Sequence, residues 1–580
     1  MRRVEGTPQP LGATSYPGYT NFAVSVPAGK TCRLLIYQKG KAEPVQTFDM
    51  LEEEGIGEVR FLGLEGFRAD RQEYNFEIDK QVCIDPYVRE VSRTKRFGEK
   101  PNPQKHEIRG RVPETAYDWE QDHHLKLPLN EVIAYSLHIR GFTKHSSSKV
   151  KHKGTFLGVI EKIPYLKSLG VNQIQCMPIY EFSEIVGHKT NYWGYGKGYY
   201  FAPKPSYSAS GHACRELKDM VKECHKAGIE VVVEMPFTPE ILSQMAIECL
   251  KYYMLEYHID GFVLNPYNAP WESMKQDPLL KGIKLIQKDD GFQIVMRRFL
   301  KGDEGMIPDV TWAIKHNSSE DNKYNYVTNQ TGFTLQDLVS YDAKHNEENG
   351  ENNQDGPDYN YSWNCGAEGP SRKKAIVELR KKQIRNALML LLLSQGTPCL
   401  LAGDEFGNSQ KGNNNVYCQD NPIGWTDWRG LEKKKELHDF VKELIAFRKS
   451  HPILTPEREL QGIDLSCCGV PDVSYHGEEA WQIPGEVSSR QLGVYYSGAQ
   501  TKSEDCYVAY NMHWLEHVFA LPALPKGYGW YVKATTERGM LDVPVLLKDQ
   551  RILELKERAV TVLTAERIVE VETKKNENIT

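Results

Sequence analysis

The chain has 580 residues, of which 40% are hydrophobic and 26% are charged, and its formal net charge at pH 7 is -6. This length exceeds a single simple core, and the composition is typical of a folded, water-soluble protein of two to four domains. The small negative charge provides no basic field for nucleic acid and suits a neutral or small-molecule ligand.

The twelve cysteines show no regular spacing, and no cluster of residues has metal-ligand spacing or forms a glycine-rich phosphate loop. We therefore expect no metal and no cofactor. The charged start of the chain is not followed by an apolar segment, and the longest apolar run, residues 388–393, is too short to span a bilayer. Together with the scattered cysteines, this predicts reduced thiols, a cytoplasmic protein and no association with a membrane.

Residues 1–105 contain short alternating runs, such as 21–26 and 32–37, separated by turn residues. Such runs are typical of half-buried strands, so we expect an N-terminal β-sandwich. The polar, proline-containing residues 106–130 are expected to form a linker.

Strands and helices alternate over residues 131–455. Strands are expected at 132–138, 171–177, 229–234, 259–264 and 399–402, and helices at 156–169, 216–227, 243–257, 371–395 and 434–449. Repeated βα units give a parallel sheet covered by helices, and a span of ~325 residues favours a closed (β/α)8 TIM barrel, an α/β fold.

Short strands return after the barrel and are expected at 506–510, 529–533 and 560–563. We assign residues 456–572 to a C-terminal β-sandwich. The polar residues 573–580 are expected to be a disordered tail.

Several motifs occur in the order found in one known family. They are Pro-Leu-Gly-Ala-Thr from Pro10, Ser-Leu-His-Ile-Arg-Gly-Phe-Thr from Ser136, Asn-Tyr-Trp-Gly-Tyr from Asn191, Tyr-Ser-Trp-Asn-Cys-Gly-Ala-Glu-Gly-Pro from Tyr361, Ala-Gly-Asp-Glu-Phe-Gly-Asn-Ser-Gln from Ala402 and Asn-Asn-Asn-Val-Tyr-Cys-Gln-Asp-Asn from Asn413. On these motifs the chain resembles, over nearly its whole length, the isoamylase and glycogen-debranching branch of the α-amylase superfamily. The resemblance implies a glycan-binding-like module at the N-terminus and an α-amylase-like catalytic barrel.

The resemblance also implies a retaining cleavage of α-1,6-linked glucan branches. That chemistry needs a carboxylate nucleophile and a second carboxyl group, about 5 Å away, that acts as acid and then as base. In this family a third carboxylate holds the distorted sugar, and an arginine keeps the nucleophile ionised.

The motif of the fourth strand, Asp260-Gly-Phe-Val-Leu-Asn, ends in an amide where the family has its nucleophile. Asn265 keeps the shape of an aspartate, but an amide is a very poor nucleophile. Val263 replaces the supporting arginine.

Two further motifs lack their carboxylates. Lys288 occupies the position of the acid/base glutamate, and a lysine is a cation at neutral pH unless it is strongly desolvated. After the seventh strand, Gln330 and Thr331 replace the histidine and aspartate of the family motif. We therefore expect no intact catalytic residue.

The motif of the third strand is also altered, because Glu234 stands for an aspartate while Thr238 and Pro239 replace an asparagine–histidine pair. The loop between Glu234 and Asp260 is shortened, and residues 288–297 are similarly compressed, which predicts a trimmed sixth-strand region. Loops at this end of the barrel build the site, so we expect a remodelled cleft.

Aromatic and amide side chains remain in the segments that the resemblance places near the cleft. They either stack on and hydrogen-bond a bound glucan or maintain the scaffold. The candidate binding residues are Tyr135, His138, Tyr192, Trp193, Tyr195, Trp363, Asn413, Asn414 and Trp425. Asp404 and Glu405 are expected to join a structural hydrogen-bond network, and the loop 347–358 is expected to be solvated surface.

Three hypotheses remain open. The first is a non-catalytic, debranching-enzyme-like protein that binds glycogen or a starch-like α-glucan or modulates an active debranching enzyme. The family offers a model for it, since plant isoamylase assemblies include a non-catalytic subunit. The second is a weak or altered glycoside hydrolase that uses Asp289, Asp290 or Glu234. The third is a structural partner without affinity for glucan.

Overall fold

The computed structural model describes the chain except residues 93–95, 100–107, 115 and 569–580, so the predicted tail lies outside the described residues. The chain divides into two compact units. The first consists of Met1–Leu127, Ala134–Lys288 and Val416–Arg429, and the second of Pro128–Ile133, Asp289–Asn415 and Gly430–Thr580.

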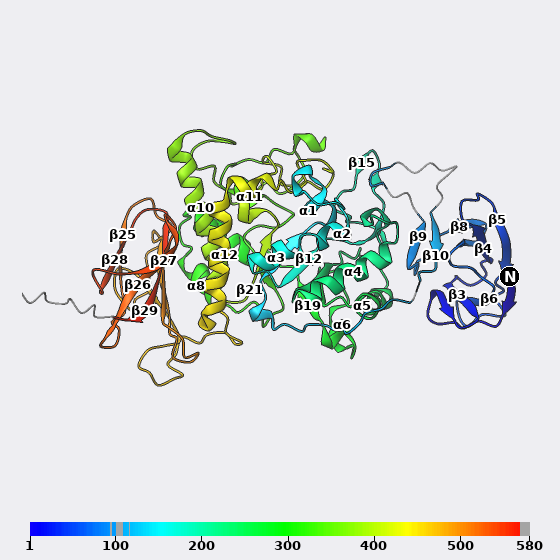
Figure 1. Cartoon of the computed structure of the whole chain (residues 1–580), viewed down its shortest axis with the longest axis horizontal. Coiled ribbons are helices and arrows are strands. Elements are labelled where there is room, and N and C mark those ends of the chain that lie inside the picture. The colour runs from blue at the N-terminus through cyan, green and yellow to red at the C-terminus, as the bar shows by residue number, and fades with distance from the viewer. Residues whose placement is uncertain (93–95, 100–107, 115, 569–580) are drawn as a thin grey trace, which may run out of the picture. The chain divides into compact units, whose positions relative to one another are not determined.

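The first unit begins with two antiparallel sheets, drawn in blue in Figure 1. One has the order β1-β6-β3-β2 and the other β5-β4-β7-β10-β9, with β8 paired to β7. Their inward residues, among them Phe22, Leu34, Leu62 and Phe76, form one core. The strands are β1 (Arg2–Val4), β2 (Gly12–Tyr16), β3 (Tyr19–Ser25), β4 (Cys32–Gln38), β5 (Pro44–Asp49), β6 (Val59–Glu65), β7 (Gln72–Ile78), β8 (Gln81–Cys83), β9 (Glu90–Ser92) and β10 (Arg109–Arg111).

Strand β10 lies inside the range predicted as a linker. Its Gly110 pairs with Tyr74 of β7, and its residues pair with those of β9. A β-carbon at Gly110 would lie 2.8 Å from the Tyr74 ring, so this close packing requires a glycine. The N-terminal β-module therefore extends at least to Arg111.

The first unit also contains five parallel strands in the order β19-β18-β17-β12-β11. The residues of β11, β12, β17 and β18 are buried throughout, as expected for strands covered on both faces. The strands are β11 (Ala134–Leu137), β12 (Gln173–Cys176), β17 (Glu230–Glu234), β18 (Gly261–Leu264) and β19 (Lys284–Gln287); the helices are α1 (Ile139–Lys144), α2 (Phe156–Ile160), α3 (Ile163–Leu169), α4 (Ala213–Lys226), α5 (Ser243–Tyr257) and α6 (Trp271–Gln276). Two small hairpins join β13 (Tyr180–Phe182) to β16 (Gly198–Pro203) and β14 (Ile185–Val186) to β15 (Lys189–Thr190).

The single helix predicted at 156–169 is two helices, α2 and α3. Pro164 lies in the first turn of α3. Proline has no backbone N–H and is tolerated in a first turn, but inside a continuous helix it would remove a hydrogen bond and clash with the preceding turn. The apolar spacing continues across this break, which is why the sequence suggested one helix.

The second unit supplies two more parallel strands, β20 (Tyr324–Asn325) and β21 (Thr397–Leu401). Residues 288–323, all of which the structure describes, contain no strand; helices α7 (Gly291–Lys301) and α8 (Ile307–Lys315) follow one another directly. The sequence predicted such a loss in the sixth-strand region. The remaining helices are α9 (Leu335–Leu338), α10 (Lys374–Leu392), α11 (Arg429–Lys433) and α12 (Lys435–Ser450).

The second unit ends in a β-sandwich, drawn in orange and red in Figure 1. A six-stranded sheet has the order β22-β23-β24-β29-β26-β27, and β25 pairs with β28. Its core surrounds the fully buried Trp530 and includes Tyr507, Phe519 and Leu563. The strands are β22 (Val473–His476), β23 (Gln491–Tyr496), β24 (Cys506–Asn511), β25 (His517–Ala520), β26 (Tyr528–Thr535), β27 (Gly539–Leu546), β28 (Ile552–Leu555) and β29 (Ala559–Arg567).

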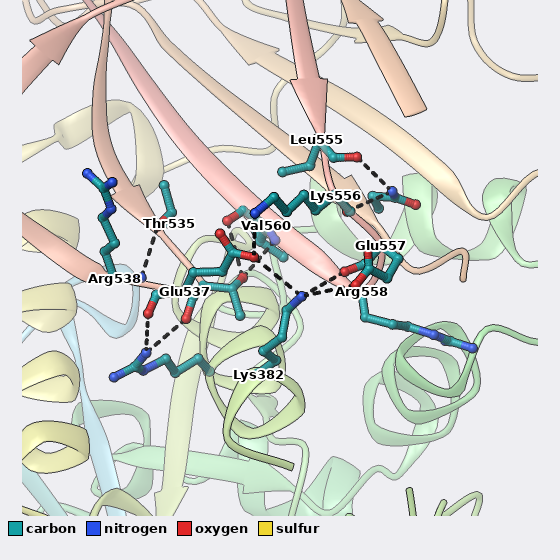
Figure 2. A network of polar contacts seen from close by, with 12 residues as sticks. Lys382, Thr535, Glu537, Arg538, Leu555, Lys556, Glu557, Arg558 and Val560 are labelled. Carbon is teal, nitrogen blue, oxygen red and sulfur yellow. Dashed lines mark hydrogen bonds and ion pairs between the residues drawn. The ribbon is translucent and has the colours of Figure 1, made fainter. Parts of the chain in front are cut away.

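Two turns of this sandwich are fixed to helix α10 (Figure 2). The Lys382 ammonium donates to the Glu557 carbonyl at 2.9 Å and lies 3.6 Å from the Glu537 carboxylate. One turn further along the helix, the buried Asn386 amide donates to the Arg558 carbonyl at 2.9 Å and accepts from the Thr536 hydroxyl at 2.6 Å. These contacts hold the turn after β26 and the turn after β28 against one helix.

Candidate functional site

Three polar side chains lie at the carboxyl ends of neighbouring strands in the first unit. Glu234 is the last residue of β17, whereas Asn265 and Lys288 directly follow β18 and β19. In the parallel register Glu234 is beside Val263, and Leu264 is beside Gln287. The carboxyl ends of parallel strands meet at one edge, which is where active sites form in barrels of this type.

Lys288 and Glu234 form an ion pair at this edge. The Lys288 ammonium lies 3.5 Å from Oε1 of Glu234, and the Tyr195 hydroxyl donates to the same oxygen at 2.9 Å. The ammonium is also 5.7 Å from the centre of the Tyr195 ring. The Glu234 side chain is only 5% exposed and that of Lys288 is 31% exposed. A cation thus neutralises this carboxylate at the strand edge.

Asn265 is exposed and uses its side chain to shape a turn. Its Oδ1 accepts a hydrogen bond from the Tyr267 backbone N–H at 3.0 Å, and its carbonyl accepts from the Asn268 and Ala269 amides at 3.1 Å. An asparagine side chain that bonds the backbone two residues further on stabilises such a turn. Val263, at the position expected for an arginine, is buried within β18.

The residues that follow β17 also shape the backbone. The Thr238 amide donates to the Tyr200 hydroxyl at 3.3 Å, and Asn268 donates to the Phe237 carbonyl at 3.1 Å. Pro239 is exposed and has no side-chain donor. The loops after β17 and β18 are therefore connected by hydrogen bonds.

The seventh-strand motif lies in the second unit. The Thr331 amide and hydroxyl both donate to Asn329 Oδ1 at 3.1 Å, and Gln330 is partly exposed. Asp404 accepts from the Thr328 hydroxyl and, at 2.9 Å, from the Leu335 amide. Burial raises the pKa of Asp404 to about 7 despite these hydrogen bonds. Asp404 thus belongs to a hydrogen-bond network, as expected from the sequence.

The two aspartates proposed as substitute acids are engaged within the second unit. Asp289 lies 3.1 Å from the Lys323 ammonium and accepts from the Gly291 amide at 2.8 Å. Asp290 accepts from the Tyr326 hydroxyl and, at 3.4 Å, from the Asn329 amide. These contacts give both carboxylates a role in holding the loop before α7.

Sequence reasoning missed Arg297, a buried cation on α7. It donates to the carbonyls of Val327 and Asn360 at 2.7 and 3.1 Å, and one terminal nitrogen, NH2, has no hydrogen-bond partner among the described residues. That nitrogen would lie 3.7 Å from a β-carbon built on Gly332, beside the seventh-strand motif. Burial lowers the pKa of Arg297 to about 10. An arginine within the largely apolar run of residues 294–300 was the available signal.

Six of the nine candidate glucan-binding residues are buried, which does not fit direct contact with a sugar. Their exposed fractions are 0% for Tyr135, 9% for His138, 1% for Tyr192, 5% for Trp193, 2% for Asn413 and 0% for Asn414. The Tyr192 hydroxyl, for example, donates to the Gly424 carbonyl at 3.0 Å. Their aromatic and amide groups serve internal packing and hydrogen bonding instead.

The two asparagines belong to a buried amide network in the second unit. Asn413 donates to Asn349 at 2.9 Å, and Asn414 donates to Asn360 at 2.9 Å and accepts from Asn346 at 2.8 Å. This network fixes the 344–360 segment. Most of the loop 347–358 is exposed, but the network buries Asn349.

His138 is also internal, because its side chain caps helix α1. Its Nδ1 accepts from the Gly141 amide at 2.9 Å, and its Nε2 lies 2.9 Å from the Tyr192 carbonyl and 3.1 Å from the Tyr207 hydroxyl. Burial lowers the pKa of His138 to about 4, so the ring is neutral at pH 7. It holds the loop after β11 rather than presenting a charge.

The other three candidates, Tyr195, Trp363 and Trp425, are partly exposed. The Arg558 guanidinium lies 4.9 Å from the centre of the Trp363 ring. The Trp425 indole donates to Asp420 at 2.9 Å and packs against an aromatic cluster of the first unit. Tyr195 alone of these contacts the Glu234–Lys288 pair.

Nothing in the described residues marks a metal centre or a membrane segment. No three histidine, cysteine, aspartate or glutamate side chains gather in a group that could hold a metal ion within that part of the chain. Nor does any described helix have the length and apolarity needed to cross a bilayer. All twelve cysteines are free thiols.

Residues 139–237 match the family model described as the catalytic domain of alpha amylase. The chain is 30% identical to isoamylase 1, chloroplastic, of Arabidopsis thaliana over 91% of its own length and 84% of that protein. It is also 30% identical to the glycogen operon protein GlgX homolog of Haemophilus influenzae, over 77% of this chain and 84% of that protein.

Solved structures show the same fold. A pullulanase from Paenibacillus barengoltzii, in complex with maltohexaose and alpha-cyclodextrin, aligns with a TM-score of 0.74 at 20% identity, over 96% of this chain and 95% of that one. GBS pullulanase SAP, in complex with maltotetraose, aligns with a TM-score of 0.75 at 15% identity, over 96% of this chain and 88% of that one. The fold is a (β/α)8 barrel flanked by β domains.

Proposed function

Because the chain belongs to the isoamylase and glycogen-debranching branch of the α-amylase superfamily, it is a protein of α-glucan metabolism, and we propose that it is a non-catalytic member that binds α-glucan and modulates an active debranching enzyme. We place it in the cytoplasm, in keeping with its twelve free thiols.

The observation that carries the proposal is the Lys288–Glu234 ion pair at the strand edge. A retaining glycosidase needs an acid that gives a proton to the leaving oxygen and a carboxylate that attacks the sugar. Lys288 stands at the expected acid position, and the one carboxylate beside it is held by that ammonium and by the Tyr195 hydroxyl. Asn265 stands at the expected nucleophile position, with an amide engaged in a turn. Neither group supplies the required chemistry.

Glucan binding is supported by the partly exposed Tyr195 at the same edge. Sugar rings have apolar faces that pack on aromatic rings, and the ammonium of Lys288 adds a hydrogen-bond donor for sugar hydroxyls. Structural relatives in the pullulanase group carry maltohexaose or maltotetraose. A partly exposed aromatic ring beside polar groups is a surface on which a sugar can be held and oriented.

The first test measures hydrolysis. Purified full-length protein is incubated with pullulan and with glycogen, and reducing ends are counted beside a family member that carries all three carboxylates. We expect a rate at least about 10³-fold lower, because proton transfer by a positioned acid alone contributes about 10²–10⁴-fold. A comparable rate would reject the proposal. Turnover that is lost in Asp290→Asn would instead favour the altered hydrolase.

The second test measures glucan binding by affinity electrophoresis in gels that contain glycogen or amylopectin. We expect wild type to be retarded and Tyr195→Ala to be retarded less, because the ring at the strand edge is lost. Tyr528→Ala is the matched control, since this tyrosine is exposed on the C-terminal sandwich. Unretarded wild type would leave only the structural-partner hypothesis.

A further inference from the structure

The second unit contains a cavity of about 470 Å³ that includes none of the degenerate catalytic positions. It lies between the N-terminal half of α10, the start of α12 and the segments that follow α9 and the short 3-10 helix Asp404–Phe406. This volume falls within the range of sites for small molecules. The lining residues are Gln336, Asp337, Ser340, Tyr341, Pro370, Ser371, Val377, Arg380, Lys381, Ile384, Arg385, Gly407, Ser409, Lys433, Lys434, Glu436 and Leu437.

The wall of this cavity is strongly cationic. Five of its side chains are lysine or arginine and only two are acidic. Both acidic groups are already engaged: Glu436 binds Arg385, and the buried Asp337 accepts from the Ser409 hydroxyl at 2.6 Å and from the Gln410 amide at 2.7 Å. Glu436 neutralises Arg385, and Glu378, outside the lining, pairs with Lys381 at 3.0 Å, so the uncompensated positive charge of the wall is that of its remaining cations.

Two of the cations lack a carboxylate partner. Lys434 donates to the Gln336 side-chain oxygen at 2.7 Å and to the Gly407 carbonyl at 3.0 Å, and no carboxylate of the described residues lies within ion-pair distance. Burial lowers the pKa of Lys434, with Asp337 acting in the opposite direction. The guanidinium of Arg380 is likewise held by backbone carbonyls, including that of Gly369 at 2.7 Å. A buried cation held by neutral oxygens gains from an anionic ligand.

Gly407 makes room for the Lys434 side chain. Its φ is +63°, a conformation that favours glycine, and a β-carbon built there would collide with the Lys434 ammonium and lie 2.9 Å from its Cδ. The Gly407 carbonyl accepts from this ammonium at 3.0 Å and so holds it at the wall of the cavity.

The rest of the wall is suited to a hydroxylated ligand. Ser340, Ser371 and Ser409 offer hydroxyl groups and Gln336 offers an amide, while Val377, Ile384 and Leu437 form an apolar side. Tyr341 is the only aromatic residue of the lining, so the wall has no pair of rings between which a nucleobase would stack. Short polar groups and an apolar side together are suited to a sugar.

From this charge and lining we propose that the cavity binds a phosphorylated monosaccharide, with the phosphate near Lys434 and Lys433 and the sugar hydroxyls on the serine-rich wall. This site is independent of glucan binding at the strand edge, because it uses none of the residues of that edge.

Calorimetric titration of the full-length protein with glucose 6-phosphate tests the proposal, with glucose and inorganic phosphate as separate probes. We expect saturable one-to-one binding of the sugar phosphate, and binding at least tenfold weaker for either probe alone. No saturable binding of glucose 6-phosphate would overturn the proposal. Inorganic phosphate that binds as tightly would overturn the assignment of a sugar.

Variants locate the binding. Lys434→Gln is expected to weaken the affinity for glucose 6-phosphate at least tenfold, whereas the neighbouring Lys435→Gln leaves it unchanged, because Lys435 pairs with Asp439 on the exposed side of α12. Lys433→Gln removes an exposed cation that the fold does not need. We expect this variant to have a two- to fivefold lower affinity for glucose 6-phosphate. Circular dichroism and the melting temperature verify folding. Unchanged affinity in both cavity variants would overturn the location.

Discussion

The Glu234–Lys288 ion pair stabilises a buried carboxylate at the strand edge. The two side chains lie at the ends of strands β17 and β19, and β18 lies between these strands. A buried carboxylate is costly unless it is paired and hydrogen-bonded, and here both conditions are met. A return to glutamate at position 288 would place two carboxylates side by side while position 265 remained an amide.

We therefore expect Lys288→Glu to lower the free energy of unfolding by about 1–2 kcal/mol at pH 7 without restoring hydrolysis. Urea denaturation of the variant and of wild type at pH 7 measures this loss.

The double variant Glu234→Gln/Lys288→Glu is the control for this prediction and is expected to recover most of the loss, because only one carboxylate remains. If Lys288→Glu unfolds at the same urea concentration as wild type at pH 7, the ion pair does not form in solution.

Asp404 makes stability depend on pH in the opposite direction from an ordinary ion-paired carboxylate. Its pKa is about 7 in the folded protein, against an ordinary value of 3.8, because of burial. Between these values the folded state binds more protons than the unfolded state, so stability falls as pH rises. We expect Asp404→Asn, which keeps the shape without the charge, to flatten this part of the profile, as measured by urea denaturation at pH 5 and pH 7.5. An unchanged slope in the variant would contradict this expectation.

At the scale of elements, helix α10 packs against both the last barrel helices and the C-terminal sandwich. Asn386, which is fully buried, satisfies the Arg558 carbonyl and the Thr536 hydroxyl and also donates to Gln383 at 2.9 Å. Lys382 contacts the same two turns from a more exposed position (Figure 2). The Asn386 amide is therefore expected to contribute more to the free energy of unfolding than the Lys382 charge.

Accordingly, Asn386→Leu should lower the free energy of unfolding by about 2–4 kcal/mol, because several buried polar groups lose their partners. Lys382→Ala, the matched control on the same helix, should cost at most about 1 kcal/mol, as is usual for an exposed ion pair. Denaturation curves of the two variants compare these losses. Equal losses would mean that the amide contributes no more than the surface charge.

The element pattern was readable from the sequence because apolar periodicity reflects burial directly. Strands such as β17 and helices such as α5 were predicted to within a residue of their bounds. What periodicity does not encode is tertiary context. It did not separate α2 from α3 at Pro164, and it did not show which aromatic residues are core. Tyr192 and Tyr195 belong to one motif, yet the first is buried and the second reaches the strand edge.

At the scale of the whole molecule, the chain has the fold of its debranching-enzyme relatives. The relatives match this chain over most of its length and not only over the barrel, since the alignment to isoamylase 1 of Arabidopsis thaliana covers 91% of it. Retained β domains are what the proposed binding and modulatory role requires, because that role depends on surfaces outside the barrel strands.

Mixing full-length protein with the catalytically competent debranching enzyme of the same organism tests this role. We expect a faster-sedimenting species in analytical ultracentrifugation and at least a twofold change in the partner's rate of reducing-end release from glycogen. If the rate effect depends on shared binding of glucan, it should weaken in Tyr195→Ala. Co-sedimentation in the absence of glucan should be unchanged in this variant, because a protein–protein contact does not need the strand edge. If the mixture shows neither co-sedimentation nor a change in rate, the modulatory role is rejected. The protein would then be a glucan-binding protein that acts alone.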